Sequence, residues 1–92
     1  MNYYKMVGKE LKQCSLQEWS DSWTNQDRQI GLDNIKEVKI STVCLGIEHS
    51  GGLFETMVFG GVHDQFQDRC YRYEEAVEMH RIAVELVKKS SN

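Results

Sequence analysis

The stretch 40–61 constrains the fold more than any other part of the sequence. Two apolar runs, Ile40–Ile47 and Leu53–Phe59, flank the polar, glycine-containing segment 48–52. β-Branched and aromatic residues dominate both runs, and such side chains suit the pleated surface of a sheet. Apolar runs joined by a short segment with glycine are typical of a β-hairpin. We therefore predict a central β-hairpin over residues 38–60.

The pairing of the two strands decides which side chains share a face of this hairpin. With Ile47 opposite Phe54, Glu48 and Glu55 share a face near the loop, and Gly46 leaves an open notch beside Glu55. Both faces are then largely apolar, whereas a hairpin with one solvated face alternates polar and apolar residues. We expect the C-terminal helix to cover one face, and the N-terminal segment or a second subunit to cover the other.

Two helices are predicted. The Ser-x-x-Glu pattern of Ser15–Glu18 is a capping box, so a short helix begins there, with Trp19 and Trp23 on one face. Tryptophans at this spacing indicate packing in a core more than a platform for stacking bases. Over Tyr73–Lys89, apolar and charged residues occupy opposite arcs at helical spacing, which predicts a long amphipathic helix. His80 falls inside the apolar arc.

The remaining strand signals are weaker. Arg28–Leu32 is predicted to be a strand that turns at Asp33 and Asn34 and continues through 35–40 into the hairpin. The N-terminal arm is expected to turn at Gly8, as a short hairpin. The predicted fold is α+β in a single domain, residues 1–92: a small antiparallel three-stranded sheet, a C-terminal amphipathic helix and a short N-terminal helix.

Length and charge exclude several classes of protein. The chain has 92 residues and a formal net charge of −3, and no basic stripe, so we expect no nucleic-acid partner. No apolar run reaches membrane-spanning length, and the N-terminus lacks the apolar segment of a signal peptide, so we expect no membrane partner and a place in the cytoplasm. Cys14, Cys44 and Cys70 fit neither a disulfide framework nor a metal motif. Because the core of so short a chain is small, a homo-oligomer is expected.

Candidate binding residues gather around the hairpin loop and the helix. Glycine N–H groups of the loop can meet a phosphate, and carboxylates can accept hydrogen bonds from ribose hydroxyls. Glu55 interrupts an apolar strand, so it needs a cationic or hydrogen-bonding partner, for which Arg69, Arg72 and His80 are the candidates. Arg28 is a further cation available for phosphate. The predicted ligand-binding residues are Glu48, His49, Ser50, Gly51, Gly52, Glu55, Arg69, Arg72 and His80.

No familiar catalytic motif occurs in the chain. There is no Walker loop, dinucleotide fingerprint, nucleophile elbow or Ser/His/Asp pattern. We therefore predict no catalytic residues, no metal and no cofactor. His80 has two interpretations: a satisfied residue of the core or an interface, or a functional group that converges with His49 and the two carboxylates Glu48 and Glu55. The second interpretation leaves a metal-dependent hydrolase open as an alternative.

Three blocks of sequence carry a resemblance to known proteins. They are Ser41–His49, Phe54–Gly61, and Tyr71–Ala76 followed by His80, and the helix start Leu16–Trp19 also fits. With these blocks the chain resembles a family of short bacteriophage and prophage proteins that share the core STVFLGxDH, a variable loop and FETMVFGG. It departs from the family pattern at Cys44, where an aromatic residue is expected, at Glu48 in place of Asp, and in a shorter loop.

The family carries no assigned activity, so the resemblance implies origin: a small phage accessory protein in the host cytoplasm. The first functional hypothesis is a non-catalytic homo-oligomer that binds a small anionic, nucleotide-like ligand and sequesters a host defence signal. The second is an inhibitor that binds a host protein through its apolar surface. The third is the metal-dependent hydrolase.

Overall fold

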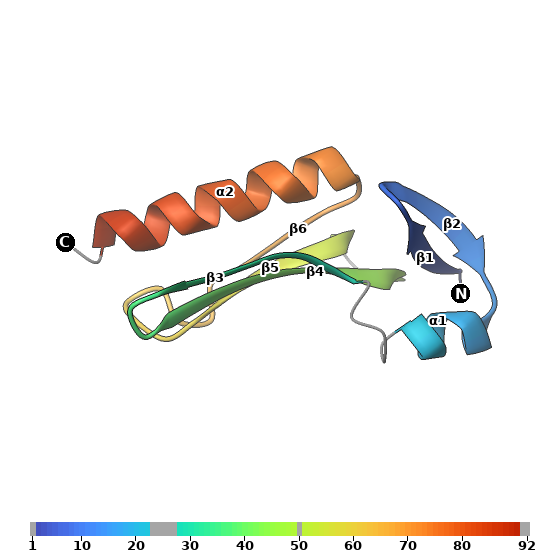
Figure 1. Ribbon diagram of the computed structural model, residues 1–92, viewed down its shortest axis with the longest axis horizontal. Coiled ribbons are helices and arrows are strands. Elements are labelled where there is room, and N and C mark those ends of the chain that lie inside the picture. The colour runs from blue at the N-terminus through green and yellow to red at the C-terminus, as the bar shows by residue number, and fades with distance from the viewer. Residues whose placement is uncertain (1, 23–27, 50, 91–92) are drawn as a thin grey trace.

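The computed structural model describes residues 2–22, 28–49 and 51–90. Figure 1 shows a long helix lying over one face of a sheet, with a small hairpin and a short helix at one end. In chain order the elements are β1 (Tyr3–Val7), β2 (Glu10–Cys14), α1 (Leu16–Ser22), β3 (Gln29–Ile35), β4 (Val38–His49), β5 (Gly52–Phe59), β6 (Gln67–Cys70) and α2 (Tyr73–Ser90).

The expected three-stranded sheet is wrong, because the sheet has six antiparallel strands. Its order is β2-β1-β4-β5-β6, and β3 pairs with β4 as well. The 12-residue β4 is long enough to have two neighbours along one edge. Its first part pairs with β3, and Ile47 near its end pairs with Tyr3 of β1. The additional strands are β1 and β2, which form an N-terminal hairpin that turns at Gly8 as expected, and the short β6.

The β4–β5 hairpin forms as expected but in a different register. Cys44, not Ile47, lies opposite Phe54, and Val43 lies opposite Glu55. The pairing shifts between Cys44 and His49, where Gly46 has a φ of 71°. Such an irregularity adds residues to one strand only, so a register counted back from the loop is wrong on the far side of it.

The turn between β3 and β4 also differs from expectation. It lies at Lys36 and Glu37, with Ile35 opposite Val38, and Lys36 has a φ of 55°. The residues expected to turn, Asp33 and Asn34, lie inside β3 opposite Ile40 and Lys39. Aspartate and asparagine favour turns, but here Asp33 is held in the strand by a bond to α2.

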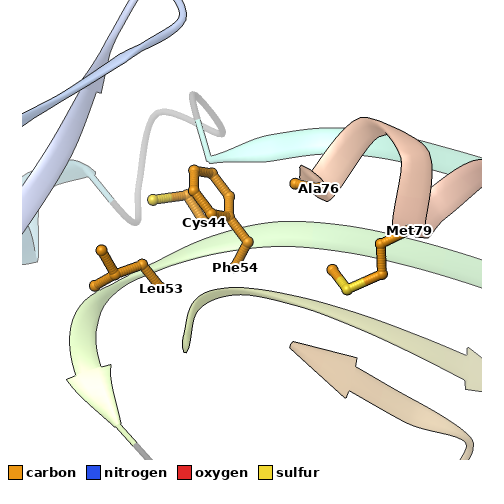
Figure 2. Close-up of a cluster of buried hydrophobic side chains, with 5 residues drawn as sticks. All are labelled: Cys44, Leu53, Phe54, Ala76 and Met79. Atoms are coloured by element: carbon orange, nitrogen blue, oxygen red, sulfur yellow. The ribbon is translucent and has the colours of Figure 1, made fainter. Parts of the chain in front are cut away.

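The core lies between α2 and the face of the sheet that α2 covers. One cluster contains Cys44, Leu53, Phe54, Ala76 and Met79 (Figure 2). Towards the C-terminal end of α2, a second cluster contains Ile40, Val58, Ala83 and Val87. Ala76 and Ala83 are fully buried, and their small side chains allow the helix to approach the strands closely.

The opposite face of the sheet is not covered by α2. It carries Leu32, Val43, Met57 and Phe59, which alternate along their strands with the residues that face the helix. We call these residues, with their polar neighbours, the open face. The N-terminal hairpin lies beyond one end of the helix-covered sheet rather than over this face (Figure 1).

The capping box forms as predicted. The Glu18 backbone N–H donates to Ser15 Oγ over 3.1 Å, and the Ser15 N–H donates to Glu18 Oε1 over 3.3 Å. Trp19 of this helix donates from Nε1 to the Leu45 carbonyl oxygen over 3.0 Å, while Trp23 lies outside the described residues. Within the described part of the chain, no helix is long and apolar enough to cross a membrane.

Candidate functional site

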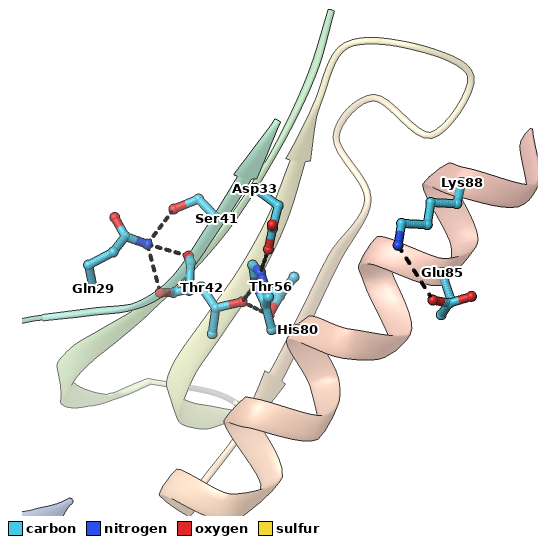
Figure 3. A network of polar contacts seen from close by, with 9 residues as sticks. Gln29, Asp33, Ser41, Thr42, Thr56, His80, Glu85 and Lys88 are labelled. Carbon is cyan, nitrogen blue, oxygen red and sulfur yellow. Dashed lines mark hydrogen bonds and ion pairs between the residues drawn. The ribbon is translucent and has the colours of Figure 1, made fainter. Parts of the chain in front are cut away.

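A chain of polar side chains runs beneath α2 and includes His80. His80 Nε2 lies 2.7 Å from Asp33 Oδ2, and its Nδ1 lies 2.6 Å from Thr42 Oγ1 (Figure 3). The Thr42 hydroxyl in turn bonds that of Thr56. Because a carboxylate only accepts hydrogen bonds, His80 carries its proton on Nε2 and, in the neutral ring, Nδ1 accepts from Thr42.

This polar chain has the order carboxylate, imidazole, hydroxyl that is found in hydrolases, but its hydroxyl cannot reach a substrate. Thr42 and Thr56 are both 0% exposed. Both ring nitrogens of His80 are already bonded, and the ring packs on Gly31, where an added Cβ would lie 2.8 Å from it. A nucleophile must be accessible to its substrate, and the Thr42 hydroxyl is not. The arrangement therefore holds α2 on the sheet.

Glu55 lies on the open face with two partners from β6. Its Oε2 accepts from Arg69 Nε over 2.9 Å and from Gln67 Nε2 over 2.9 Å. Arg69 NH2 also lies 2.8 Å from that oxygen, and the two side chains are only 27% and 13% exposed, Arg69 and Glu55 respectively. Of the three candidate partners for Glu55, the structure selects Arg69, which lies directly opposite it across the strands.

The loop of the hairpin comes close to this ion pair. A Cβ added at Gly51 would lie 3.7 Å from Arg69 Cδ. Gly51, Gln67, Asp68 and Arg69 line an open hollow of about 650 Å³. Gly52 is buried against the backbone of Cys70, so its role there is close packing. The structure thus brings together the glycine loop, Glu55 and Arg69.

The other predicted site residues lie elsewhere. His80 belongs to α2 and contacts the face of the sheet opposite to the one that carries Glu55. Arg72 is exposed just before α2, with its Nε 3.9 Å from Glu75. Glu48 and His49 lie in β4, but their side chains and all of Ser50 are outside the described residues. Among the residues that are described, no group of three or more His, Cys, Asp or Glu side chains is placed to hold a metal ion.

Arg28, which the sequence offered as a phosphate ligand, has a structural position. It is 5% exposed, and it donates from Nε to Ser22 Oγ over 2.9 Å and from NH1 to the Leu45 carbonyl over 2.7 Å. Its guanidinium also lies 5.2 Å from the centre of the Trp19 ring. Burial lowers the pKa of Arg28. It joins the end of α1 to β4, and nothing in the sequence distinguishes it from a surface arginine.

A groove between β6 and α2 was not anticipated from the sequence. It is an open groove of about 450 Å³, and its apolar lining is Cys70, Met79 and Ile82. Its charged lining is Asp68, Glu74, Glu75 and Glu78, together with Arg69. We call this feature the β6–α2 groove. Acidic residues near the start of α2 are already expected from the helix dipole, which favours negative charge at a helix N-terminus. They therefore gave no separate sequence signal for a groove.

The groove contains a thiol that is protonated at neutral pH. Burial raises the pKa of Cys70 to about 11. Its Sγ lies 3.6 Å from the Arg72 carbonyl oxygen. Because the thiolate is the reactive form of cysteine, Cys70 behaves here as a small apolar wall of the groove.

No protein-family model, curated protein or solved structure matches this chain. The resemblance to short phage proteins therefore stays a prediction. The function of the protein has to be inferred from the geometry of the described residues.

Proposed function

We propose that the protein is a non-catalytic binding protein that holds a segment of another polypeptide in the β6–α2 groove. The observation that carries this proposal is the groove itself, where an apolar lining of Cys70, Met79 and Ile82 lies beside a strand at the edge of the sheet. Ile82 is 53% exposed on α2 and lies in the same lining as Met79 and Cys70. This is the second of the functional classes that the sequence left open.

The interior position of the polar chain supports a role without catalysis. The one described set of side chains that has the order of a catalytic triad places its hydroxyl, Thr42, at 0% exposure. The carboxylate most isolated in the sequence, Glu55, is neutralised by Arg69. Binding of a partner at the surface requires neither a reactive Thr42 hydroxyl nor a free Glu55 carboxylate.

The test is a peptide array of varied composition, probed with the wild-type protein and two variants. Ile82→Asp places a charge in the groove, whereas Val77→Asp places the same charge at a position of α2 that is 47% exposed and does not line the groove. We expect a set of peptides that bind the wild type and Val77→Asp but lose about tenfold or more in affinity for Ile82→Asp. Equal losses for both variants, or binding that neither variant changes, would reject the groove.

A second candidate function is the capture of a small anionic, nucleotide-like ligand at the loop of the β4–β5 hairpin. It is favoured by the hollow in which Arg69 lies beside Gly51, with Gln67 as a further donor. If the chain has the phage origin that its resemblance implies, such a ligand is a host defence signal. Pairing of Arg69 with Glu55 weakens this candidate relative to the first, because the guanidinium must give up a partner to meet a phosphate.

A thermal-shift screen against nucleotides and cyclic dinucleotides tests the second candidate. A ligand that binds only the folded state raises the melting temperature with its concentration. We expect the shift to be lost in Arg69→Ala and kept in Arg72→Ala, because Arg72 does not line the hollow. Each variant is compared with its own ligand-free melting temperature. Absence of any shift in the wild type leaves only the first candidate.

We propose further that a second copy of the chain covers the open face. Leu32 and Phe59 remain 49% and 40% exposed there, and both signs of charge occur among their polar neighbours Lys39, Glu55 and Arg69. In a two-fold dimer the same patch of both copies meets itself, so a patch that carries both signs of charge can be self-complementary.

A further inference from the structure

We infer that the occupant of the β6–α2 groove is an extended segment that carries a basic and an apolar side chain two residues apart, and that it binds by adding a strand to β6. This inference rests on the proposed polypeptide-binding function and specifies its partner. Three features carry it: the edge of β6, the side chains that this edge presents to α2, and the charge of the groove.

The outer edge of β6 is open to a further strand. Within residues 2–22, 28–49 and 51–90, β6 pairs with β5 alone and is the last strand of the sheet. The Arg69 backbone N–H donates to the Asp68 carboxylate over 2.9 Å, so this amide points away from β5. A side chain that covers an edge amide protects the edge from unwanted pairing, and a partner strand replaces it with a carbonyl oxygen.

The alternation of side chains in β6 decides what an added strand presents to α2. Asp68 and Cys70 lie opposite Thr56 and Phe54, which are buried on the face that α2 covers. Every second side chain of an added strand therefore points towards α2, with about 6.8 Å between them. One such side chain meets the apolar lining at Cys70, and the next lies beside Asp68 and the acidic residues of α2.

The charge of the groove selects a cation for that second position. Four carboxylates line it, from Asp68, Glu74, Glu75 and Glu78. Two of them have arginine neighbours: Arg81 NH2 bonds Glu78 and Arg72 lies 3.9 Å from Glu75. The excess is thus negative, and exposed pairs of this kind exchange partners at little cost. Arg69 also lines the groove, but its guanidinium is paired with Glu55 on the other side of the sheet, so it does not neutralise these four carboxylates.

The experiment uses a blocked six-residue peptide. Lysine and leucine take turns at every second position, and threonine occupies the positions between them. The peptide is titrated into the isotopically labelled protein while backbone amide shifts are followed by NMR. We expect saturable shifts confined to β6 and the first half of α2. A matched peptide with glutamate for lysine should bind at least tenfold more weakly, and added salt should weaken binding of the lysine peptide.

Two further controls separate charge from strand addition. The double variant Glu74→Gln/Glu78→Gln should lose about three- to tenfold in affinity for the lysine peptide, while Glu85→Gln, which does not line the groove, should lose none. Methylation of the alternate backbone nitrogens that face β6 should abolish binding, and methylation of the others should not.

Each contrary result has a definite meaning. Equal binding of the lysine and glutamate peptides, tolerance of both methylation patterns, or no saturable shift at millimolar peptide overturns the inference. The proposed function fails separately, when no peptide of the array depends on Ile82. If the array yields groove-dependent peptides that are neither basic nor sensitive to methylation, the function stands and this description of its partner is wrong.

Discussion

Two glycines each receive an aromatic ring from another element, and they show how single residues decide this fold. Gly46 has a φ of 71°, and an added Cβ would lie 2.5 Å from the Tyr4 carbonyl oxygen and 2.8 Å from the Trp19 ring. The notch expected at Gly46 therefore exists, but Trp19 occupies it and Glu55 is not beside it. In β3, Gly31 makes similar room for the His80 ring.

Gly46→Ala should lower the free energy of unfolding by about 2–4 kcal/mol, because left-handed backbone strain adds to a steric clash. The measurement is urea unfolding followed by tryptophan fluorescence. The matched control is Gly8→Ala, since Gly8 has a similar φ of 63° but no atom of the described residues within 4 Å of the added Cβ. That control should cost only about 1–2 kcal/mol. Equal costs would show that Trp19 does not dock at Gly46.

Thr42→Val should lower the free energy of unfolding by about 1–3 kcal/mol, because it keeps the shape but leaves His80 Nδ1 and the Thr56 hydroxyl without their shared partner. A double-mutant cycle with Thr56→Val measures the coupling. Because both variants break the same chain of bonds, the double variant should cost less than the sum of the single ones. Additive costs would mean that the two hydroxyls act independently.

At the scale of elements, the sequence predicted what depends on local chemistry. The capping box at Ser15, the turn at Gly8, the central hairpin and the long helix from Tyr73 all follow from nearest neighbours along the chain. The three-stranded sheet and the register were wrong because both depend on pairing. The irregularity after Cys44 shifts every pair on the side away from the loop, and Gly46 within the strand was its only sequence signal.

The candidate site was predictable to a similar degree. The need of Glu55 for a cation followed from its place in an apolar strand, and Arg69 meets that need. The expected convergence of His80 with the hairpin loop does not occur. The observed register places Thr56, and not Glu55, on the face of the sheet that α2 covers. The β6–α2 groove depends on how a helix crosses a strand edge, which periodicity along one chain does not contain.

The first helix should lose stability in acid. The Lys5 hydrogen bond, then the Ser15 N–H, lowers the pKa of Glu18 below its ordinary value. A group with a lowered folded pKa stabilises the protein above its unfolded pKa and loses this effect as the pH falls through the folded pKa. The melting temperature of the wild type should therefore exceed that of Glu18→Gln at pH 7 and approach it near pH 3. A constant difference between the two across this range would contradict the assignment.

At the scale of the whole molecule, the layers are unequal. The molecule measures 45 × 22 × 21 Å, and α2 covers one face of the sheet while the open face has no layer of its own among the described elements (Figure 1). In a two-layer protein, one face of the sheet is buried under the helix, and the other face either contacts solvent or packs against another chain. The apolar residues of the open face favour sharing.

Met57→Lys should therefore dissociate the proposed dimer. Met57 lies in the middle of the open face, between Ser41 and Gln67, so a lysine there is desolvated in the dimer and solvated in the monomer. Sedimentation velocity over a micromolar concentration series should show a dimer for the wild type and a monomer for the variant. Val62→Lys, in the exposed turn after β5, should sediment as the wild type does. A wild type that is monomeric at high micromolar concentration rejects the dimer.

The polar chain beneath α2 has a consequence for how the helix is aligned on the sheet. Alanine, methionine and valine offer α2 an apolar surface on which sliding by one turn, about 5.4 Å, would preserve much of the buried area. His80 opposes the slide, since a shifted ring would lose its bonds to Thr42 and Asp33 and would no longer rest in the space above Gly31. Burial of apolar side chains stabilises the packing of α2 on the sheet, while the imidazole of His80 fixes the position of the helix along the strands.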